Sequence, residues 1–130
     1  MSMRVSITNV FLVLASPSLA CDCGTSPLSE RVLLSNYVFR GEVVGYAPLQ
    51  SAELRVLERF KGETPGQLVV VAGRSDCDYF LEPTRARSGD QFLIFTTKTA
   101  LGSAGSRCLG SAPVESASSE LELLRKGLTK

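Results

Sequence analysis

The chain has 130 residues, which suits one domain. Its 14 basic and 13 acidic side chains form no long run of like charge, so we expect neither a nucleic-acid interface nor a basic amphipathic membrane helix. The sequence contains no histidine, the usual general base of enzymes. We therefore predict no enzymatic activity and no cofactor.

The first twenty residues have the order of a secretory signal peptide. Arg4 gives a short basic start, residues 5–15 are mostly apolar, and Ser18 and Ala20 are small residues three and one positions before Cys21. The apolar stretch is too short to cross a bilayer as a helix. We predict a mature chain of residues 21–130 without a transmembrane segment, secreted into an extracellular or periplasmic space. An uncleaved N-terminal extension is the alternative.

Four cysteines lie in the predicted mature chain: Cys21, Cys23, Cys77 and Cys108. An even count in a small exported domain indicates a disulfide framework. A Cys21–Cys23 bond is disfavoured because one intervening residue closes a strained ring, which leaves two pairings open. A four-cysteine zinc site is the main alternative, but such sites usually contain two close cysteine pairs. A redox-active pair is disfavoured because no C-x-x-C motif is present.

A short helix is predicted over residues 27–35. Ser26 and Pro27 suit a helix N-cap and first turn, and Leu28, Val32 and Leu33 follow at helical spacing.

Five strands are predicted after this helix. Gly41 and Gly45 indicate bulges in the first strand, and alternation in the second places Leu54, Val56 and Glu58 on one face. The remaining glycine-, serine- and arginine-rich segments, 83–90 and 99–107, are expected to form loops. The strands span residues 37–46, 52–60, 67–72, 91–97 and 105–110.

A second helix is predicted over residues 120–126. Ser116, Ser118 and Ser119 offer N-caps, and Gly127 is a stop signal. Its apolar stripe consists of Leu121, Leu124 and Leu128. Five short strands between two helices suit a small closed or partly open Greek-key barrel. A sandwich is the other reading, but it would need about seven strands.

Several segments occur in a familiar order. Cys21-Asp22-Cys23 follows the predicted cleavage point, and residues 38–43 belong to the first predicted strand. Residues 60–62 form a basic-Gly turn, and Cys77 follows the third predicted strand. Residues 89–95 join a Gly-rich turn to a strand, and Cys108 and a helix come after them. This order resembles the netrin-like domain, specifically the N-terminal domain of the tissue inhibitors of metalloproteinases. The resemblance covers residues 21 to about 126. The sequence departs from that family at two points. The residue between the first two cysteines is usually small or neutral in the family, and here it is Asp22. The family also has a third disulfide in this domain, for which no cysteines remain here.

The resemblance implies a five-stranded OB-type barrel with two disulfides, Cys21–Cys77 and Cys23–Cys108. It also implies an inhibitor that binds its target through Cys21, Asp22 and Cys23. The α-amine and carbonyl oxygen of Cys21 would chelate the catalytic zinc of a partner zinc metalloendopeptidase, whose open coordination position normally holds water. Asp22 would then enter the pocket beside the metal, where a carboxylate is costly unless the pocket is basic.

Three other readings stay open. In the first reading, the domain is a non-inhibitory netrin-like binding or structural module, since a fold alone does not fix function. Residues 18–21 faintly resemble a lipobox, which would place a lipid on Cys21. The carboxylates Asp76, Asp78 and Glu82 suit acid–base chemistry less well than a solvated turn around Cys77. The aromatic residues Tyr37, Phe39, Phe92 and Phe95 are expected in the barrel core rather than in a base-stacking platform.

Overall fold

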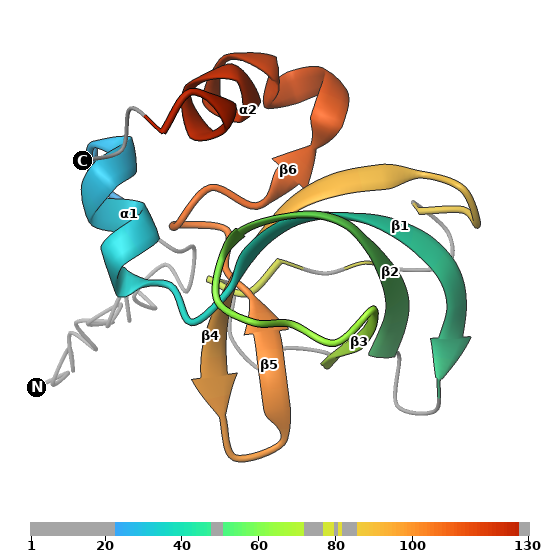
Figure 1. The fold of residues 1–130 in the computed structure, drawn as a ribbon. Coiled ribbons are helices and arrows are strands. Elements are labelled where there is room, and N and C mark those ends of the chain that lie inside the picture. Colours follow the sequence, from blue (N-terminus) through green and yellow to red (C-terminus); the bar gives the residue numbers. More distant parts are fainter. Residues whose placement is uncertain (1–22, 48–50, 72–76, 80, 82–85, 128–130) are drawn as a thin grey trace, which may run out of the picture.

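The computed structural model describes residues 23–47, 51–71, 77–79, 81 and 86–127. The predicted signal peptide, Cys21, Asp22, Asp76, Glu82 and Leu128 lie outside the described residues. The elements, shown in Figure 1, are α1 (Leu28–Leu34), β1 (Val38–Ala47), β2 (Ser51–Lys61), β3 (Gln67–Val71), β4 (Gln91–Thr99), β5 (Gly102–Gly105), β6 (Ala112–Pro113), the 3₁₀ helix η2 (Val114–Ser116) and α2 (Ser118–Arg125).

The strands form a closed barrel. β1 pairs with β2, β2 with β3, and β4 with β5, all antiparallel, whereas β3 and β5 run parallel. The antiparallel pairing of β1 with β4 closes the ring of five strands. The predicted mainly β barrel with two helices is therefore confirmed, and the sandwich alternative is wrong.

The prediction of the fifth strand was wrong. β5 lies at Gly102–Gly105, inside the segment expected to be a loop, and residues 107–110 form turns instead. Glycine, serine and alanine have weak strand preference, so β5 exists because β3 and β4 flank it and pair with its backbone. The two-residue β6 was not predicted; it pairs with β4 at the edge of the sheet, where a proline is tolerated.

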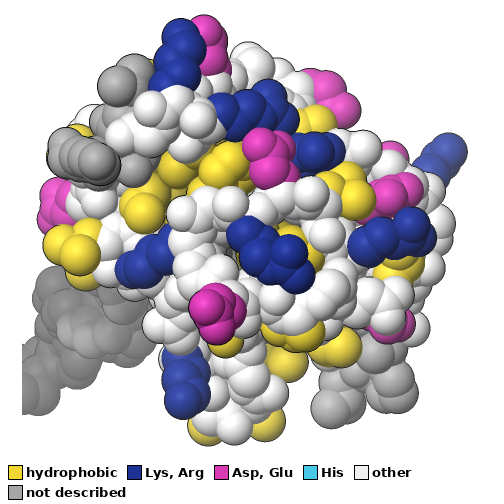
Figure 2. Space-filling view, viewed as in Figure 1, with side chains coloured by type: hydrophobic (Ala, Val, Ile, Leu, Met, Phe, Trp, Pro, Cys, Tyr) yellow, Lys and Arg dark blue, Asp and Glu magenta, His cyan; other side chains and the backbone are white. Residues whose placement is uncertain are grey.

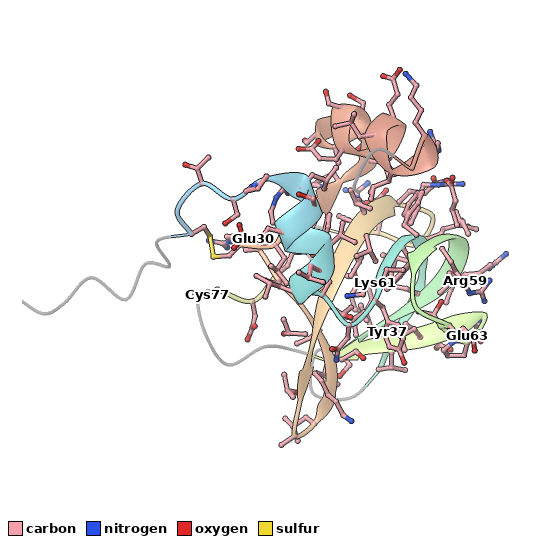
Figure 3. All side chains as sticks on the ribbon, turned by 60° about the vertical axis from the view of Figure 1, so that its left-hand side comes forward. Glu30, Tyr37, Arg59, Lys61, Glu63 and Cys77 are labelled. Atoms are coloured by element: carbon pink, nitrogen blue, oxygen red, sulfur yellow. A yellow bond between two sulfur atoms is a disulfide. The ribbon has the colours of Figure 1, made fainter. Side chains whose placement is uncertain are left out.

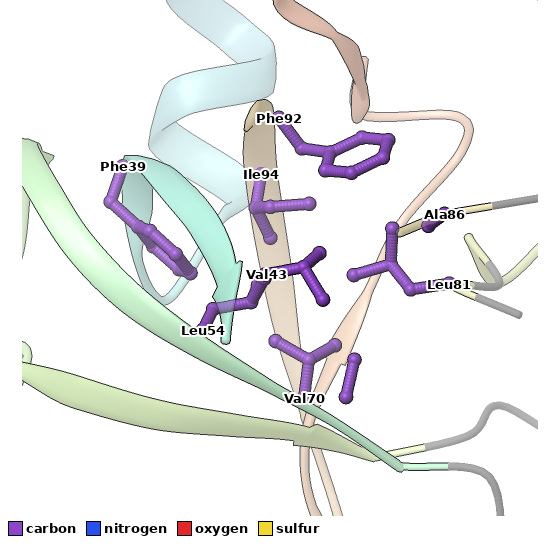
Figure 4. Close-up of a cluster of buried hydrophobic side chains, with 9 residues drawn as sticks. Phe39, Val43, Leu54, Val70, Leu81, Ala86, Phe92 and Ile94 are labelled. Carbon is purple, nitrogen blue, oxygen red and sulfur yellow. The ribbon is translucent and has the colours of Figure 1, made fainter. Parts of the chain in front are cut away.

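The interior of the barrel holds one hydrophobic cluster (Figure 4). Inward-facing side chains of all the longer strands meet there because successive residues of a strand point to opposite faces. Its buried members are Phe39, Val43, Ala52, Leu54, Val70, Leu81, Ala86, Phe92 and Ile94. Tyr37 packs against this cluster and Phe95 lies in a second one, so the four aromatic residues belong to the core as predicted.

The second cluster lies between the outer face of the sheet and the helices. Val38, Leu93 and Phe95 contribute from the strands, and Leu121 and Leu124 from α2. Leu28 and Val32 of α1 pack against the edge of this cluster, four residues apart and hence on one helix face. Leu33, also expected in this stripe, is 76% exposed, because a seven-residue helix presents only one narrow face to the barrel.

The helix caps differ from the serines that the sequence suggests. Pro27, not Ser26, is the N-cap residue of α1, and Ala117 takes that position in α2; neither end has a side-chain capping hydrogen bond. The predicted stop at Gly127 is confirmed, since this residue has a φ of 66° and donates a backbone hydrogen bond to Leu124.

Bulges change the faces of β2. The β1–β2 register shifts between Arg40 and Gly41 and between Val43 and Gly45, as the two glycines predicted. The first shift leaves Leu57 without a direct partner on β1. As a result Glu58 faces outward beside Arg40, and its predicted place on the inner face with Leu54 and Val56 was wrong.

Candidate functional site

A disulfide fastens the segment before α1 to the barrel. Cys23 and Cys108 are bonded, with their Cα atoms 4.8 Å apart and a sequence separation of 85. This is one of the two bonds that the resemblance implies. The other, Cys21–Cys77, requires Cys21, which lies outside the described residues. It stays a prediction, and the described part of the chain contains one disulfide rather than two.

Cys77 lies next to this disulfide. The backbone N–H of Arg107 donates to the carbonyl oxygen of Cys77 at 2.9 Å, and Asp78 forms an antiparallel bridge with Ser106. Figure 3 shows the disulfide and the labelled Cys77 on the same side of the barrel. None of the described cysteines is a free thiol. The topology therefore brings together three cysteines that are widely separated in sequence.

Arg31 connects α1 to the turn that contains Cys108. Its Nε donates to the carbonyl oxygen of Ser26 at 3.1 Å, and its Nη1 donates to that of Leu109 at 3.2 Å. The guanidinium also lies over the ring of Phe95, 5.8 Å from its centroid, within the range of a cation–π contact. Arg31 thus links the residues on both sides of the disulfide to the second hydrophobic cluster.

The turn after Cys108 requires glycine. Gly110 has a φ of 115°, and a Cβ at this position would lie 2.3 Å from Nη1 of Arg31. The neighbouring Ser111 is buried, and its hydroxyl accepts from the N–H of Phe95 and donates to the Phe95 carbonyl. The Cys108 turn is therefore fixed to β4 by hydrogen bonds and to the segment before α1 by the disulfide.

A third contact fixes the other end of α1. Lys61, at the end of β2, donates from Nζ to the carbonyl oxygens of Val32, Leu33 and Ser35 at 2.9, 2.9 and 2.6 Å. These are carbonyls of the last helical turn and of its cap, which a cation satisfies well. The sequence marked Lys61 only as part of a turn, and it gave Arg31 no role. Neither contact has a local sequence signal, because both join segments far apart in the chain.

Tyr79, two residues after Cys77, is an ionisable group that lies against the barrel core. Tyr79 packs edge-on against Phe92 with ring centroids 6.1 Å apart. Burial raises the pKa of Tyr79, against a smaller opposing effect of Arg107, so the phenol is neutral at physiological pH. Within the described residues, no three acidic, cysteine or histidine side chains are grouped as metal ligands. On the face shown in Figure 2, basic and acidic side chains are interspersed.

Comparison of the sequence with protein-family models found no match, and comparison with curated proteins found none either. Among the described residues, no helix has the length and apolar character needed to cross a bilayer. The functional argument therefore rests on the residues and on the geometry above.

Proposed function

We propose that the protein is an exported, non-enzymatic, netrin-like domain that inhibits a zinc metalloprotease through its mature N-terminus. The strand order β1-β2-β3-β5-β4, closed by β1 and with β3 parallel to β5, supports an OB-type barrel. The disulfide supports an oxidising compartment, as expected for a secreted or periplasmic protein.

The observation that carries the proposal is the Cys23–Cys108 disulfide with Cys77 beside it. Cys23 is two residues after the predicted mature start, and it is bonded to a turn that Arg31 and Ser111 fix to the barrel. A chain end attached so close to a rigid body loses little conformational entropy on binding, which favours affinity. An inhibitor that presents a backbone amine and carbonyl to a metal needs this kind of attachment.

The chemistry of inhibition follows from the chain end. An α-amine has a pKa of about 7.7–8.0, so a usable fraction is neutral near pH 7 and has a free lone pair. Together with the Cys21 carbonyl oxygen it would displace the water from the open position of a catalytic zinc. Asp22 would lie beside the metal, so we expect the target to have a basic pocket there, because an unpaired buried carboxylate is costly.

The test compares three forms of the mature disulfide-bonded protein: unmodified, acetylated at the Cys21 α-amine, and extended by one glycine before Cys21. We expect the unmodified form to inhibit at least one member of a panel of zinc metalloendopeptidases. Acetylation should abolish that inhibition because an amide nitrogen cannot coordinate the zinc. An unchanged circular dichroism spectrum and urea midpoint would show that the fold is intact.

A non-inhibitory binding module is the second candidate function, and the charge of Asp22 favours it because most such protease pockets are apolar. It predicts that no protease of the panel is inhibited and that the glycine extension changes no binding. Inhibition that survives acetylation would contradict the chelation mechanism itself. Intact mass of the natural protein would reveal a lipid on Cys21 and thereby exclude a free amine.

A further inference from the structure

The interior of the barrel becomes polar toward one end. The inward row of β4 runs from Phe92 and Ile94 in the core to Thr96 and Lys98, since these residues alternate with outward-facing ones. On β5, Ser103 lies directly opposite Lys98. Tyr37, immediately before β1, packs against the core. The hydrophobic cluster is therefore followed by a ring of polar side chains, which we call the barrel mouth.

An open pocket of about 390 Å³ lies at this mouth. Its described lining consists of Asn36, Tyr37, Lys98, Gly102 and Ser103. The volume is within the usual range of small-molecule sites, and the mouths of β-barrels are a common place for them. Figure 3 shows Tyr37 well away from Cys77, so the mouth is separate from the disulfide region.

The walls of this pocket are already in place. The N–H of Asn36 donates to the carbonyl of Thr96 at 2.8 Å, and Tyr37 exchanges hydrogen bonds with the backbone and hydroxyl of Thr96. The ring of Tyr37 lies against the Gly62 turn, where a Cβ would be 2.5 Å from its Cδ1. These contacts fix the ring, so a ligand would not have to order it on binding.

The polar groups of the lining are available to a ligand. Within the described part of the chain, the Asn36 amide, the Tyr37 hydroxyl, the Lys98 ammonium and the Ser103 hydroxyl form no hydrogen bond or ion pair. By contrast, Lys61 and Arg59 are engaged with backbone carbonyls. The described lining of the mouth thus combines one free cation, three hydrogen-bonding groups and an aromatic ring.

From this arrangement we infer that the barrel mouth binds a small organic carboxylate that carries a ring. Lys98 would neutralise the carboxylate, Ser103 and Asn36 would donate hydrogen bonds to it, and the ring would pack against Tyr37. A single ammonium suits a monoanion better than a phosphate, because phosphate sites usually recruit arginines or successive backbone N–H groups. The ligand can be an aromatic acid or a sugar acid, since both kinds of ring pack on the face of a tyrosine.

The test is an NMR titration of the mature disulfide-bonded protein, following backbone amides. The probes are benzoate, galacturonate and benzamide, the neutral isostere of benzoate. We expect saturable shifts at Asn36, Lys98 and Ser103 with benzoate or galacturonate at millimolar concentrations. The acid that saturates the shifts at the lower concentration shows whether the site prefers an aromatic ring or a sugar ring. Benzamide should bind at least tenfold more weakly.

Matched lysine variants complete the experiment. Lys98→Gln should weaken binding of the acid at least tenfold, whereas Lys126→Gln, an exposed lysine on α2, should leave it unchanged. Both side chains are exposed, so the amide spectrum should show that both variants fold. The inference is overturned if neither acid gives saturable shifts at the mouth, if benzamide binds as well as benzoate, or if Lys98→Gln binds like the wild type. These outcomes do not depend on protease inhibition.

Discussion

Arg31 shows how one side chain organises the candidate site. A guanidinium is planar and has several donors in fixed directions, so it can bond two carbonyls and still stack on a ring. Arg31 does this with Ser26, Leu109 and Phe95. A lysine would offer a point charge without the stacking plane. The arginine therefore joins the segment after Cys23 and the segment after Cys108 to the same aromatic ring.

Glu58 is a carboxylate that pairs with two arginines from different elements. Arg125 of α2 and Arg40 of β1 both reach it, each with a closest N–O distance of 3.0 Å. The hydrogen bond from Arg125, aided by Arg40 and opposed by partial burial, lowers the pKa of Glu58 below its ordinary value of 4.5. This group couples the C-terminal helix to the outer face of the barrel.

The pH dependence of stability should reveal this carboxylate. Because its pKa is lower in the folded state, folding favours the ionised form, and the stabilisation is present above pH 4.5 and lost as the pH falls through the lowered pKa. We expect Glu58→Gln to lower the free energy of unfolding by about 0.5–1 kcal/mol at pH 7. Urea unfolding from pH 7 to pH 2 would measure the difference, which should shrink at the acidic end. A difference that is the same at every pH would contradict this assignment.

At the scale of elements, burial explains α2 better than helix preference does. Its eight residues are too few to be stable alone, so it depends on its contact with the barrel. The buried leucines, Leu121 and Leu124, lie three residues apart on one face, and Arg125 adds the ion pair with Glu58. The sequence predicted this stripe because a helix repeats every 3.6 residues.

Two leucines of α2 provide a matched test of this packing. Leu121 is 5% exposed and Leu123 is 40% exposed, two positions apart on the same helix. We expect Leu121→Ala to lower the free energy of unfolding by about 2–4 kcal/mol, through lost burial and a cavity. Leu123→Ala should cost less than about 1 kcal/mol. Chemical denaturation of both variants measures the contrast. Equal losses would show that α2 packs through a different face.

The strand β5 illustrates the limit of local patterns. Its four residues are glycine, serine and alanine, which favour no regular structure in isolation, and they were expected in a loop. The strand forms between β3 and β4, whose unpaired backbone groups need partners in the closed ring. A strand of this kind can be predicted only when the positions of both neighbouring strands are known.

At the scale of the whole molecule, the disulfide joins the start of the described chain to the turn after β5. Cys23 precedes every element and Cys108 follows β5, so the bond closes a loop with a sequence separation of 85. The double variant Cys23→Ser, Cys108→Ser should lower the free energy of unfolding by about 4 kcal/mol in the chain-entropy model. Differential scanning calorimetry or urea unfolding would measure this loss. An unchanged midpoint would show that the barrel alone fixes this segment.

The sequence by itself determined the elements that have a strong local period. Alternation together with the turn that follows it located β2, an apolar run after Gly89-Asp90 located β4, glycines located the bulges of β1, and leucine spacing located α2. The cysteine spacing left two pairings open, and the family resemblance pointed to the bond between Cys23 and Cys108.

Only the tertiary structure decided how these pieces meet. It placed Cys77 beside the disulfide, joined Arg31 of α1 to the Cys108 turn and Lys61 to the end of α1, turned Glu58 outward, and assembled the barrel mouth around Lys98. Each of these contacts joins residues from different elements. The physical reason is that hydrophobic period and charge can be read from a short stretch of sequence. The partner of a side chain depends on how distant strands pair when the barrel closes, which a short stretch of sequence does not show.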